Sequence, residues 1–299
     1  MRRIRVRLDV AYDGTDFSGW AVQPTRRTVA GELTAVLTRL FGTVEGLTVA
    51  GRTDAGVHAT GQVCHVDVPA DRWDALSAAL LRKLAGLLPP DVRVLAAAEV
   101  PPEFDARFSA LSRRYEYRVT DAAWGASPLR RHDTVAWPRP LDLDALNAAA
   151  EGLVGEHDYA AFCRRKEHAT TIRAVNRLDW RRDPDGILVA TVQADAFCQQ
   201  MVRSLVGAQL FVGDGRRPAA WPAGLLTRRV RADEVTVAPA HGLALVEVTY
   251  PDDPADLLAR AELTRRRRDA DDQPAPPADG TEPTGLSRRD WPAGLSRRD

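Results

Sequence analysis

A carboxylate, a guanidinium and two glycines share one nine-residue segment, Gly51-Arg52-Thr53-Asp54-Ala55-Gly56-Val57-His58-Ala59. Glycine permits positive φ and a close approach of the backbone, so this segment can present Asp54 to a ligand. Arg52 can make paired hydrogen bonds to a phosphate or to the carboxylate itself. Aspartate and glycine are also ordinary turn residues. A carboxylate presented in this way can act as a nucleophile, stabilise positive charge at a sugar, or move a proton.

Two further positions carry side chains suited to a nucleic-acid base or to a carboxylate. Tyr115 lies in a strand-like segment, where its ring can pack on a sheet or stack on an extruded base. Arg203 lies in an otherwise apolar helical segment, where an arginine needs a partner. We expect Asp54 to be that partner, and Asp195 is the alternative.

Taken together, these segments resemble the TruA-type tRNA pseudouridine synthases. The resemblance runs from residue 4 to residue 251 and follows the family's order. Besides the Asp54 segment it is carried by Tyr12-Asp13-Gly14-Thr15-Asp16-Phe17-Ser18-Gly19-Trp20, Gly61-Gln62-Val63 with His65, Leu87-Leu88-Pro89-Pro90-Asp91-Val92, Ala106-Arg107-Phe108-Ser109-Ala110, Ser112-Arg113-Arg114-Tyr115-Glu116-Tyr117, Gly155-Glu156-His157-Asp158-Tyr159, Ala194-Asp195-Ala196-Phe197, Met201-Val202-Arg203-Ser204-Leu205-Val206-Gly207, His241-Gly242-Leu243 and Tyr250-Pro251.

The resemblance implies an α+β fold of two related halves, whose antiparallel sheets join around a central cleft. It implies isomerisation of uridine to pseudouridine at positions 38, 39 and 40 in the anticodon stem-loop of tRNA. Asp54 matches the family's catalytic aspartate, and Arg52, Tyr115 and Arg203 are the expected substrate-binding residues. The resemblance also implies a metal-free, cofactor-free enzyme that works as a homodimer, with one tRNA touching both subunits.

Four positions depart from the family's pattern. Asp105 stands where members usually have histidine, and Ala85 stands where asparagine is common. Gln199 and Gln200 replace a pair that is often His-His. None of these departures removes Asp54 or another residue of the central chemistry, but they weaken any expectation that these four side chains align RNA.

The amino-acid composition is that of a globular protein and limits the classes to which the chain can belong. The chain has 299 residues, 44% of them hydrophobic and 27% charged, as in a globular protein. No stretch approaches the ~18–20 apolar residues of a membrane helix, and the N-terminus lacks the apolar core of a signal peptide, so we expect a cytoplasmic protein. Cys64, Cys163 and Cys198 form no C-x-x-C pair, which favours reduced structural cysteines over zinc. No phosphate-binding loop or dinucleotide fingerprint indicates a cofactor.

Charge restricts how such a chain can bind RNA. The 41 basic and 41 acidic residues cancel, and the part before residue 252 carries only about +2. An RNA surface must therefore be a local patch. Arg113, Arg114 and the run Arg164-Arg165-Lys166 are basic clusters that either contact phosphates or are simply solvated.

Hydrophobic periodicity predicts two successive units of antiparallel strands and helices, which is an α+β arrangement. Strands are expected at 4–10, 48–51, 62–68, 92–96, 113–119, 174–182, 187–193 and 243–249, and helices at 29–40, 74–86, 142–153 and 198–212. The expected domains are an N-terminal half, 1–104, with the Asp54 segment, and a C-terminal half, 105–251. The tail, 252–299, is expected to be disordered apart from a short helix at 254–268.

Three alternative functions remain open at this stage. The first is a pseudouridine synthase with other RNA targets, and the second is a non-catalytic RNA-binding module on the same scaffold. The third, a metal-dependent nuclease, would need clustered carboxylates. His58 and His65 are weak evidence for a metal, because no other ligands cluster with them in the sequence.

Overall fold

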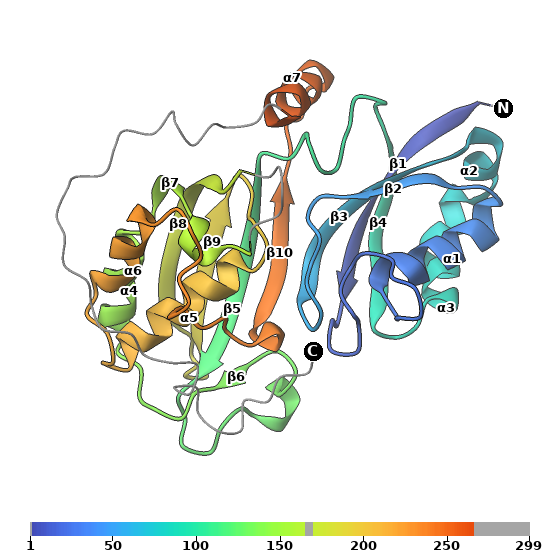
Figure 1. Ribbon diagram of the computed structural model, residues 1–299. Helices are drawn as coiled ribbons and strands as arrows, with labels where there is room; N and C mark the ends of the chain where they lie inside the picture. Colours follow the sequence, from blue (N-terminus) through green and yellow to red (C-terminus); the bar gives the residue numbers. More distant parts are fainter. Residues whose placement is uncertain (1, 165–169, 266–299) are drawn as a thin grey trace. The chain divides into compact units, whose positions relative to one another are not determined.

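The structure, a computed structural model, describes residues 2–164 and 170–265 and divides into two compact units (Figure 1). The first unit contains Met1–Arg114 and Ala244–Arg266, and the second contains Tyr115–Leu243. This division differs from the expected boundary after residue 104. The C-terminal strand returns to the first unit because it pairs in parallel with a strand there, Ala244 opposite His58 and Leu245 opposite Ala59.

The first unit is built on strands in the order β4-β1-β3-β10, with β2 beside β3. Their bounds are β1 Arg3–Tyr12, β2 Glu45–Val49, β3 His58–Pro69, β4 Val92–Val100 and β10 Leu243–Thr249. Strand β1 pairs antiparallel with both neighbours, so Leu8 lies opposite Cys64 on β3 and opposite Ala97 on β4. Along β1 every second residue is buried, as the alternation of apolar and charged residues predicts.

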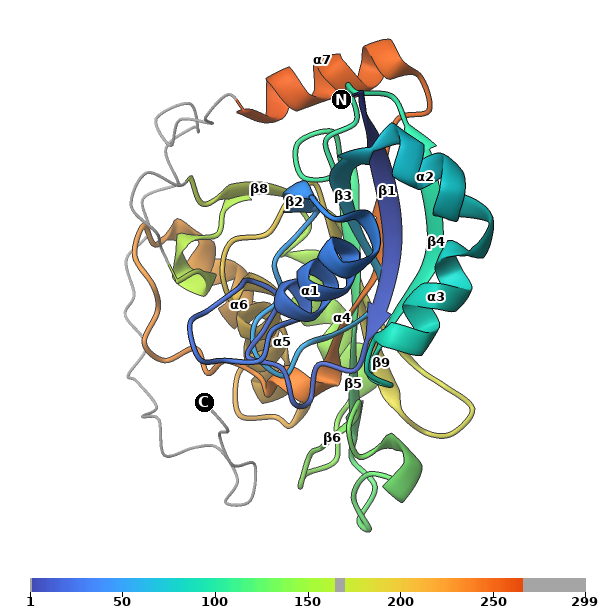
Figure 2. The same cartoon turned by 90° about the vertical axis from the view of Figure 1, so that its right-hand side faces the viewer.

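Three helices cover one face of these strands (Figures 1 and 2). They are α1 Val29–Phe41, α2 Ala70–Leu76 and α3 Leu80–Leu87, with the 3₁₀ turn η1 Ser77–Ala79 between the last two. Helix α1 begins where the Thr28 hydroxyl accepts from Gly31 N at 3.3 Å, and it buries Leu33, Leu37 and Phe41. The helical structure expected at 74–86 is confirmed, but it is divided between α2, η1 and α3, because the backbone of Ala79 leaves the α-helical region at φ −114° and ψ 3°.

Helix α7, Pro254–Arg265, also belongs to the first unit. It confirms the prediction of a short helix near the start of the tail. It buries Leu257 and Ala261, and Arg260 Nε donates to Ala110 O at 3.2 Å. The rest of the tail, 266–299, lies outside the described residues. Residues 252–265 of the tail are therefore part of the folded first unit.

The second unit has strands in the order β5-β9-β8-β7, with β6 in parallel beside β5. Their bounds are β5 Ser112–Thr120, β6 Val135–Ala136, β7 Gly155–Asp158, β8 Ile172–Arg182 and β9 Leu188–Ala194. The helices are α4 Leu143–Glu151, α5 Met201–Gly213 and α6 Trp221–Gly224, and the 3₁₀ turns are η2 Pro128–Arg130, η3 Ala160–Phe162, η4 Leu225–Thr227 and η5 Ala240–Gly242. Helix α4 packs on β8 and α5. Both units mix helices with largely antiparallel strands, which confirms the α+β class.

Among the described residues, no helix is both long enough and apolar enough to cross a membrane.

Candidate active site

The loop that carries Asp54 joins β2 to β3 and is fixed by backbone hydrogen bonds. Trp20 N donates to Thr53 O at 3.1 Å, and Gly56 N donates to Phe17 O at 3.3 Å. Within the loop, Val57 N donates to Asp54 O at 3.2 Å. Asp54 is half-buried and Arg52 is exposed. The main chain is thus held on both sides of Asp54 while its side chain stays partly accessible.

Glycines allow the loop after β1 to touch the Asp54 loop backbone to backbone. A Cβ on Gly14 would lie 2.0 Å from Val57 O, and a Cβ on Gly19 would lie 2.7 Å from Thr53 O. Gly19 also has a φ of +92°, which other residues rarely adopt. No larger residue fits at these two positions, so the glycines set how closely the two loops approach.

A buried polar network lies behind the loop. The Tyr12 hydroxyl is 2.8 Å from Thr53 Oγ1, and Gln62 Nε2 donates to Tyr12 Oη at 3.2 Å and to Gly51 O at 2.8 Å. Gln62 is fully buried. Tyr12 and Gln62 were predicted only as motif positions, without a role of their own. Gln62 lies in a largely apolar predicted strand, and a buried amide must find hydrogen-bond partners. Its position in the sequence could therefore have predicted a buried hydrogen-bond network.

Arg113 is buried and is therefore not accessible to a phosphate. It is 6% exposed, and its Nη2 donates to Ala50 O at 2.9 Å and to Arg107 O at 2.6 Å. The interpretation of Arg113 as part of an RNA-tracking cluster is therefore wrong, because burial removes it from a polyanion's reach. Arg114 pairs with Glu247 at 3.1 Å. Arg164 is exposed, whereas residues 165 and 166 of its cluster lie outside the described residues.

The two histidines near the loop make hydrogen bonds to the backbone. His58 Nδ1 accepts from Gly14 N at 3.0 Å and lies 3.1 Å from Asp13 Oδ1. His65 Nδ1 accepts from Ala106 N at 3.0 Å. Across residues 2–164 and 170–265, no three His, Cys, Asp or Glu side chains gather as a metal site would require.

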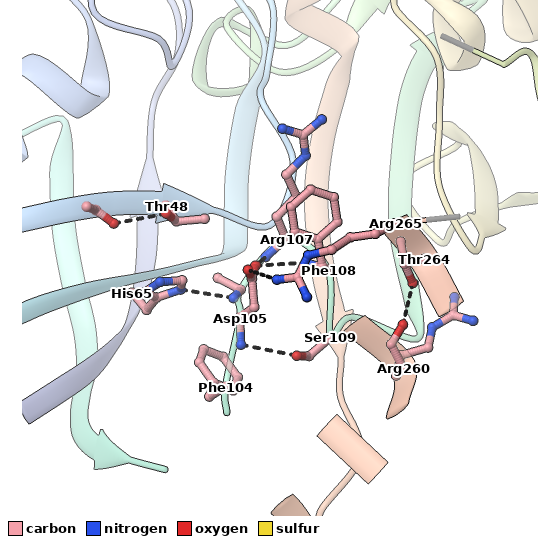
Figure 3. A network of polar contacts seen from close by, with 12 residues as sticks. Thr48, His65, Phe104, Asp105, Arg107, Phe108, Ser109, Arg260, Thr264 and Arg265 are labelled. Atoms are coloured by element: carbon pink, nitrogen blue, oxygen red, sulfur yellow. Dashed lines mark hydrogen bonds and ion pairs between the residues drawn. The ribbon is translucent and has the colours of Figure 1, made fainter. Parts of the chain in front are cut away.

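Asp105, one of the departures from the family pattern, folds a turn (Figure 3). Its Oδ1 accepts from Arg107 N and from Phe108 N, both at 2.9 Å, while its own N donates to Ser109 Oγ at 3.1 Å. The other oxygen, Oδ2, pairs with Arg265 at 3.2 Å. An aspartate at this position therefore has a local structural role, as in other Asx turns.

His65 makes the stability of the protein depend on pH. Burial, and then repulsion from the Arg5 guanidinium, lower the pKa of His65 to about 4. In the unfolded chain the pKa is about 6.5, so between pH 6.5 and 4 only the unfolded state binds this proton. We expect this residue to reduce the free energy of unfolding as the pH falls through that window, by at most about 3 kcal/mol.

The measurement is urea unfolding at several pH values for wild type and His65→Asn, since the amide keeps an acceptor for Ala106 N but does not titrate. In the His65→Asn variant, the free energy of unfolding should depend much less on pH between 6.5 and 4 than it does in the wild type. His132→Asn, at an exposed site, is the control and should keep the pH dependence of the wild type. Equal slopes in wild type and His65→Asn would contradict the depressed pKa. Asp67, whose pKa is lowered by its hydrogen bond to Arg5, adds a loss of stability at more acidic pH in all three proteins.

Tyr115 and Arg203 lie in the second unit. The Tyr115 ring is mostly buried and meets Phe197 edge to face, with centroids 5.3 Å apart. Arg203 is the one residue of α5 that is not fully buried, and its Nε donates to Ala238 O at 2.7 Å. Asp195, the alternative partner, accepts backbone hydrogen bonds from Ala174 and Ala196 at 2.9 and 2.8 Å. The pairing of Arg203 with Asp54, which lies in the first unit, stays a prediction.

The expectation that all three cysteines are reduced is wrong for two of them. Cys163 and Cys198 form a disulfide with Cα atoms 5.7 Å apart, although they were expected to be reduced. The fold brings them together because Arg164 N donates to Gln199 O at 2.9 Å. Cys64 is free and buried, as expected, and burial raises the pKa of its thiol. Gln200 begins α5 with a φ of +67°, and its Oε1 accepts from Arg231 at 2.9 Å.

Comparison with known proteins identifies the family of this chain. A family model described as tRNA pseudouridine synthase matches residues 149–251. A protein of Frankia casuarinae named tRNA pseudouridine synthase A is 60% identical over 266 residues, covering 89% of this chain and 96% of its own. Proteins of the same name from Streptomyces griseus and Streptomyces avermitilis are 59% and 55% identical over 269 residues, each covering 89% of this chain and 94% of its own.

These matches, together with the α+β fold, identify an enzyme of the isomerase class. Similarity at this level covers 89% of the chain and therefore extends over both units. The chain belongs to the TruA-type family of tRNA pseudouridine synthases.

Proposed function

We propose that this chain converts uridine to pseudouridine at positions 38, 39 and 40 of the tRNA anticodon stem-loop, with Asp54 as the catalytic carboxylate. The observation that carries the proposal is the Asp54 loop itself. Its main chain is fixed at Thr53, Asp54 and Gly56, while Asp54 stays partly accessible. Such a loop presents a carboxylate in a set position, which covalent or electrostatic catalysis at a sugar requires.

The reaction is an isomerisation and needs no oxidant or reductant. The bond from N1 of uracil to C1′ of the ribose breaks, the base turns, and C5 forms a new bond to C1′. The proton lost from C5 is balanced by the proton gained at N1. A carboxylate can attack the sugar, attack the uracil ring, or assist formation of a glycal, and each route uses one group at the position of Asp54.

The other proposed site residues supply contacts to the RNA. Arg52 is exposed on the same loop, two residues from Asp54, where its guanidinium can bind a phosphate in a forked geometry. Tyr115 offers an aromatic face for an extruded uracil, and the edge-to-face contact with Phe197 supports its ring. Arg203 is proposed to pair with Asp54 when the site is assembled.

The proposed partners follow from the family and from the charge. With 41 basic and 41 acidic residues, the chain has no global positive field to attract RNA. A homodimer in the cytoplasm, holding one tRNA against both subunits, would gather basic side chains from two copies. Light scattering of the purified protein at micromolar concentration should give twice the chain mass, and a fully active monomer would contradict the dimer.

The proposal is tested in cells that carry or lack this gene. We expect pseudouridine at positions 38, 39 and 40 of tRNA to disappear on deletion and to return when the wild-type gene is restored. Restoring the gene with Asp54→Asn is the matched control and should leave the three positions as uridine. Unchanged modification at all three positions after deletion would refute the proposed targets, whereas loss of pseudouridine elsewhere in RNA would point to the alternative with shifted targets.

A further inference from the structure

Two successive carbonyls at the start of the Asp54 loop are each bound by a buried side chain. Arg113 Nη2 donates to Ala50 O at 2.9 Å, and Gln62 Nε2 donates to Gly51 O at 2.8 Å. Ala50 is further fixed by its own N–H, which donates to Val63 O at 2.8 Å. Arg52, Thr53 and Asp54 follow directly. The point at which the chain leaves β2 for the loop is thus determined by side chains from β5 and β3.

We propose that Arg113, assisted by Gln62, is a positioning residue for Asp54. The inference rests on the proposed function, since it concerns the placement of the same carboxylate. Arg113 contacts the carbonyl of Ala50, four residues before Asp54, so its effect on catalysis passes through the main chain of the loop. It is not a catalytic residue.

Burial argues that Arg113 serves this purpose. A guanidinium that is only 6% exposed is costly to bury, and its fork has to be satisfied by fixed acceptors. Two of these are the carbonyls of Ala50 and Arg107, which lie 57 residues apart in the chain. Their separation in the sequence means that one side chain joins the Asp54 loop to the turn formed by residues 105–109.

That turn is itself well anchored. Asp105 accepts from the N–H groups of Arg107 and Phe108, and His65 accepts from the N–H of Ala106 at 3.0 Å. Tyr250 Oη donates to Ala106 O at 2.7 Å. Arg113 therefore bridges the loop to a turn that is hydrogen bonded to His65 of β3. Loss of the bridge should let the loop move without unfolding the unit.

The primary test is Arg113→Lys, which keeps the charge but replaces a planar fork by a single ammonium that cannot reproduce its geometry. Single-turnover rates and tRNA dissociation constants are measured well below the melting temperature of each protein. We expect the rate to fall about 10- to 100-fold, because a displacement of about 1 Å of a catalytic group is enough for that loss. The tRNA dissociation constant should stay within about twofold of wild type, since a buried side chain does not meet phosphate.

Arg5→Lys is the matched control. Arg5 Nη1 also donates to two carbonyls, Pro102 O at 2.7 Å and Phe104 O at 3.0 Å, and lies in the same unit. Its described contacts do not include the Asp54 loop. The Arg5→Lys substitution should reduce the stability of the protein while leaving its single-turnover rate near that of wild type. Gln62→Met provides a second probe, because it removes the donor to Gly51 O while nearly conserving volume, and it should lower the rate as Arg113→Lys does.

Hydrogen exchange gives a readout that does not depend on activity. The amides of Gly56 and Val57, which are hydrogen bonded in the loop, should exchange faster in Arg113→Lys but not in Arg5→Lys. A folded Arg113→Lys protein with a wild-type rate and unchanged loop exchange would overturn the inference and leave Arg113 merely structural. A selective loss of tRNA affinity at an unchanged rate would also overturn it. If the wild-type protein itself forms no pseudouridine, the proposed function fails instead, and the exchange experiment still decides whether Arg113 positions the loop.

Discussion

Asp54→Asn is expected to bind tRNA like the wild-type protein and to form pseudouridine at a rate lower by a factor on the order of 10³ or more. The amide has the same shape as the carboxylate but is neither a useful nucleophile nor a base. Asp54 is half-buried on a loop whose main chain is held by Trp20, Phe17 and Val57, so the substitution opens no cavity and keeps these main-chain hydrogen bonds. Single-turnover assays with saturating enzyme measure the rate, and filter binding measures affinity.

Asp16→Asn is the control for Asp54→Asn. Asp16 is an exposed carboxylate on the neighbouring loop, and its loss should change neither rate nor affinity. If Asp54→Asn kept a tenth of the wild-type rate, Asp54 would not be the catalytic carboxylate. If it lost tRNA affinity to the same degree as rate, Asp54 would act in binding, and the chemistry would have to be placed on another residue.

Gly14→Ala should cause a large structural disturbance near the site. The added Cβ would lie 2.0 Å from Val57 O and 2.5 Å from Val57 C, and both are main-chain atoms that cannot rotate away. Overpacking of this kind typically costs ~1–3 kcal/mol, and a rigid backbone contact is at or above the upper end of that range. Because Val57 N donates to Asp54 O, displacement of Val57 also moves Asp54.

We therefore expect Gly14→Ala to reduce the free energy of unfolding by about 3 kcal/mol and the single-turnover rate by about 100-fold. Gly86→Ala is the control, because a Cβ there would have no heavy atom within 4 Å and the site lies on helix α3. It should stabilise by up to about 1 kcal/mol through helix propensity and leave the rate unchanged. A Gly14→Ala protein with normal stability and rate would mean that the two loops do not approach as described.

Much of the fold could be predicted because local sequence decides it. Ile4, Val6 and Leu8 alternate with charged residues, and this alternation correctly predicted β1. The strand predicted at 243–249 has the same first and last residues as β10. By contrast, β7 is four residues long and reads Gly-Glu-His-Asp, a composition without strand propensity. It forms because it pairs with β8, which is a tertiary effect that no local pattern carries.

The candidate site shows the same limit. Asp54 could be selected as a candidate because Gly51, Arg52, Asp54 and Gly56 lie within one short segment. Arg113 could not be separated from Arg114 by pattern, since they are adjacent and alike. One is buried against Ala50 O and Arg107 O and the other pairs with Glu247, and these partners are distant in sequence. The disulfide between Cys163 and Cys198 depends likewise on a contact formed only in the folded chain.

The most direct test of the central claim, that this chain isomerises uridines 38 to 40 of tRNA through Asp54, uses purified protein and two tRNA transcripts. One carries uridine at positions 38, 39 and 40, and the other carries cytidine at these three positions and is otherwise identical. Pseudouridine is mapped across each transcript after incubation with wild type and with Asp54→Asn. The expected result is pseudouridine at the three positions of the first transcript with wild type, and none in the other three reactions. Pseudouridine formed by Asp54→Asn, or formed by wild type only outside these positions, would contradict the account.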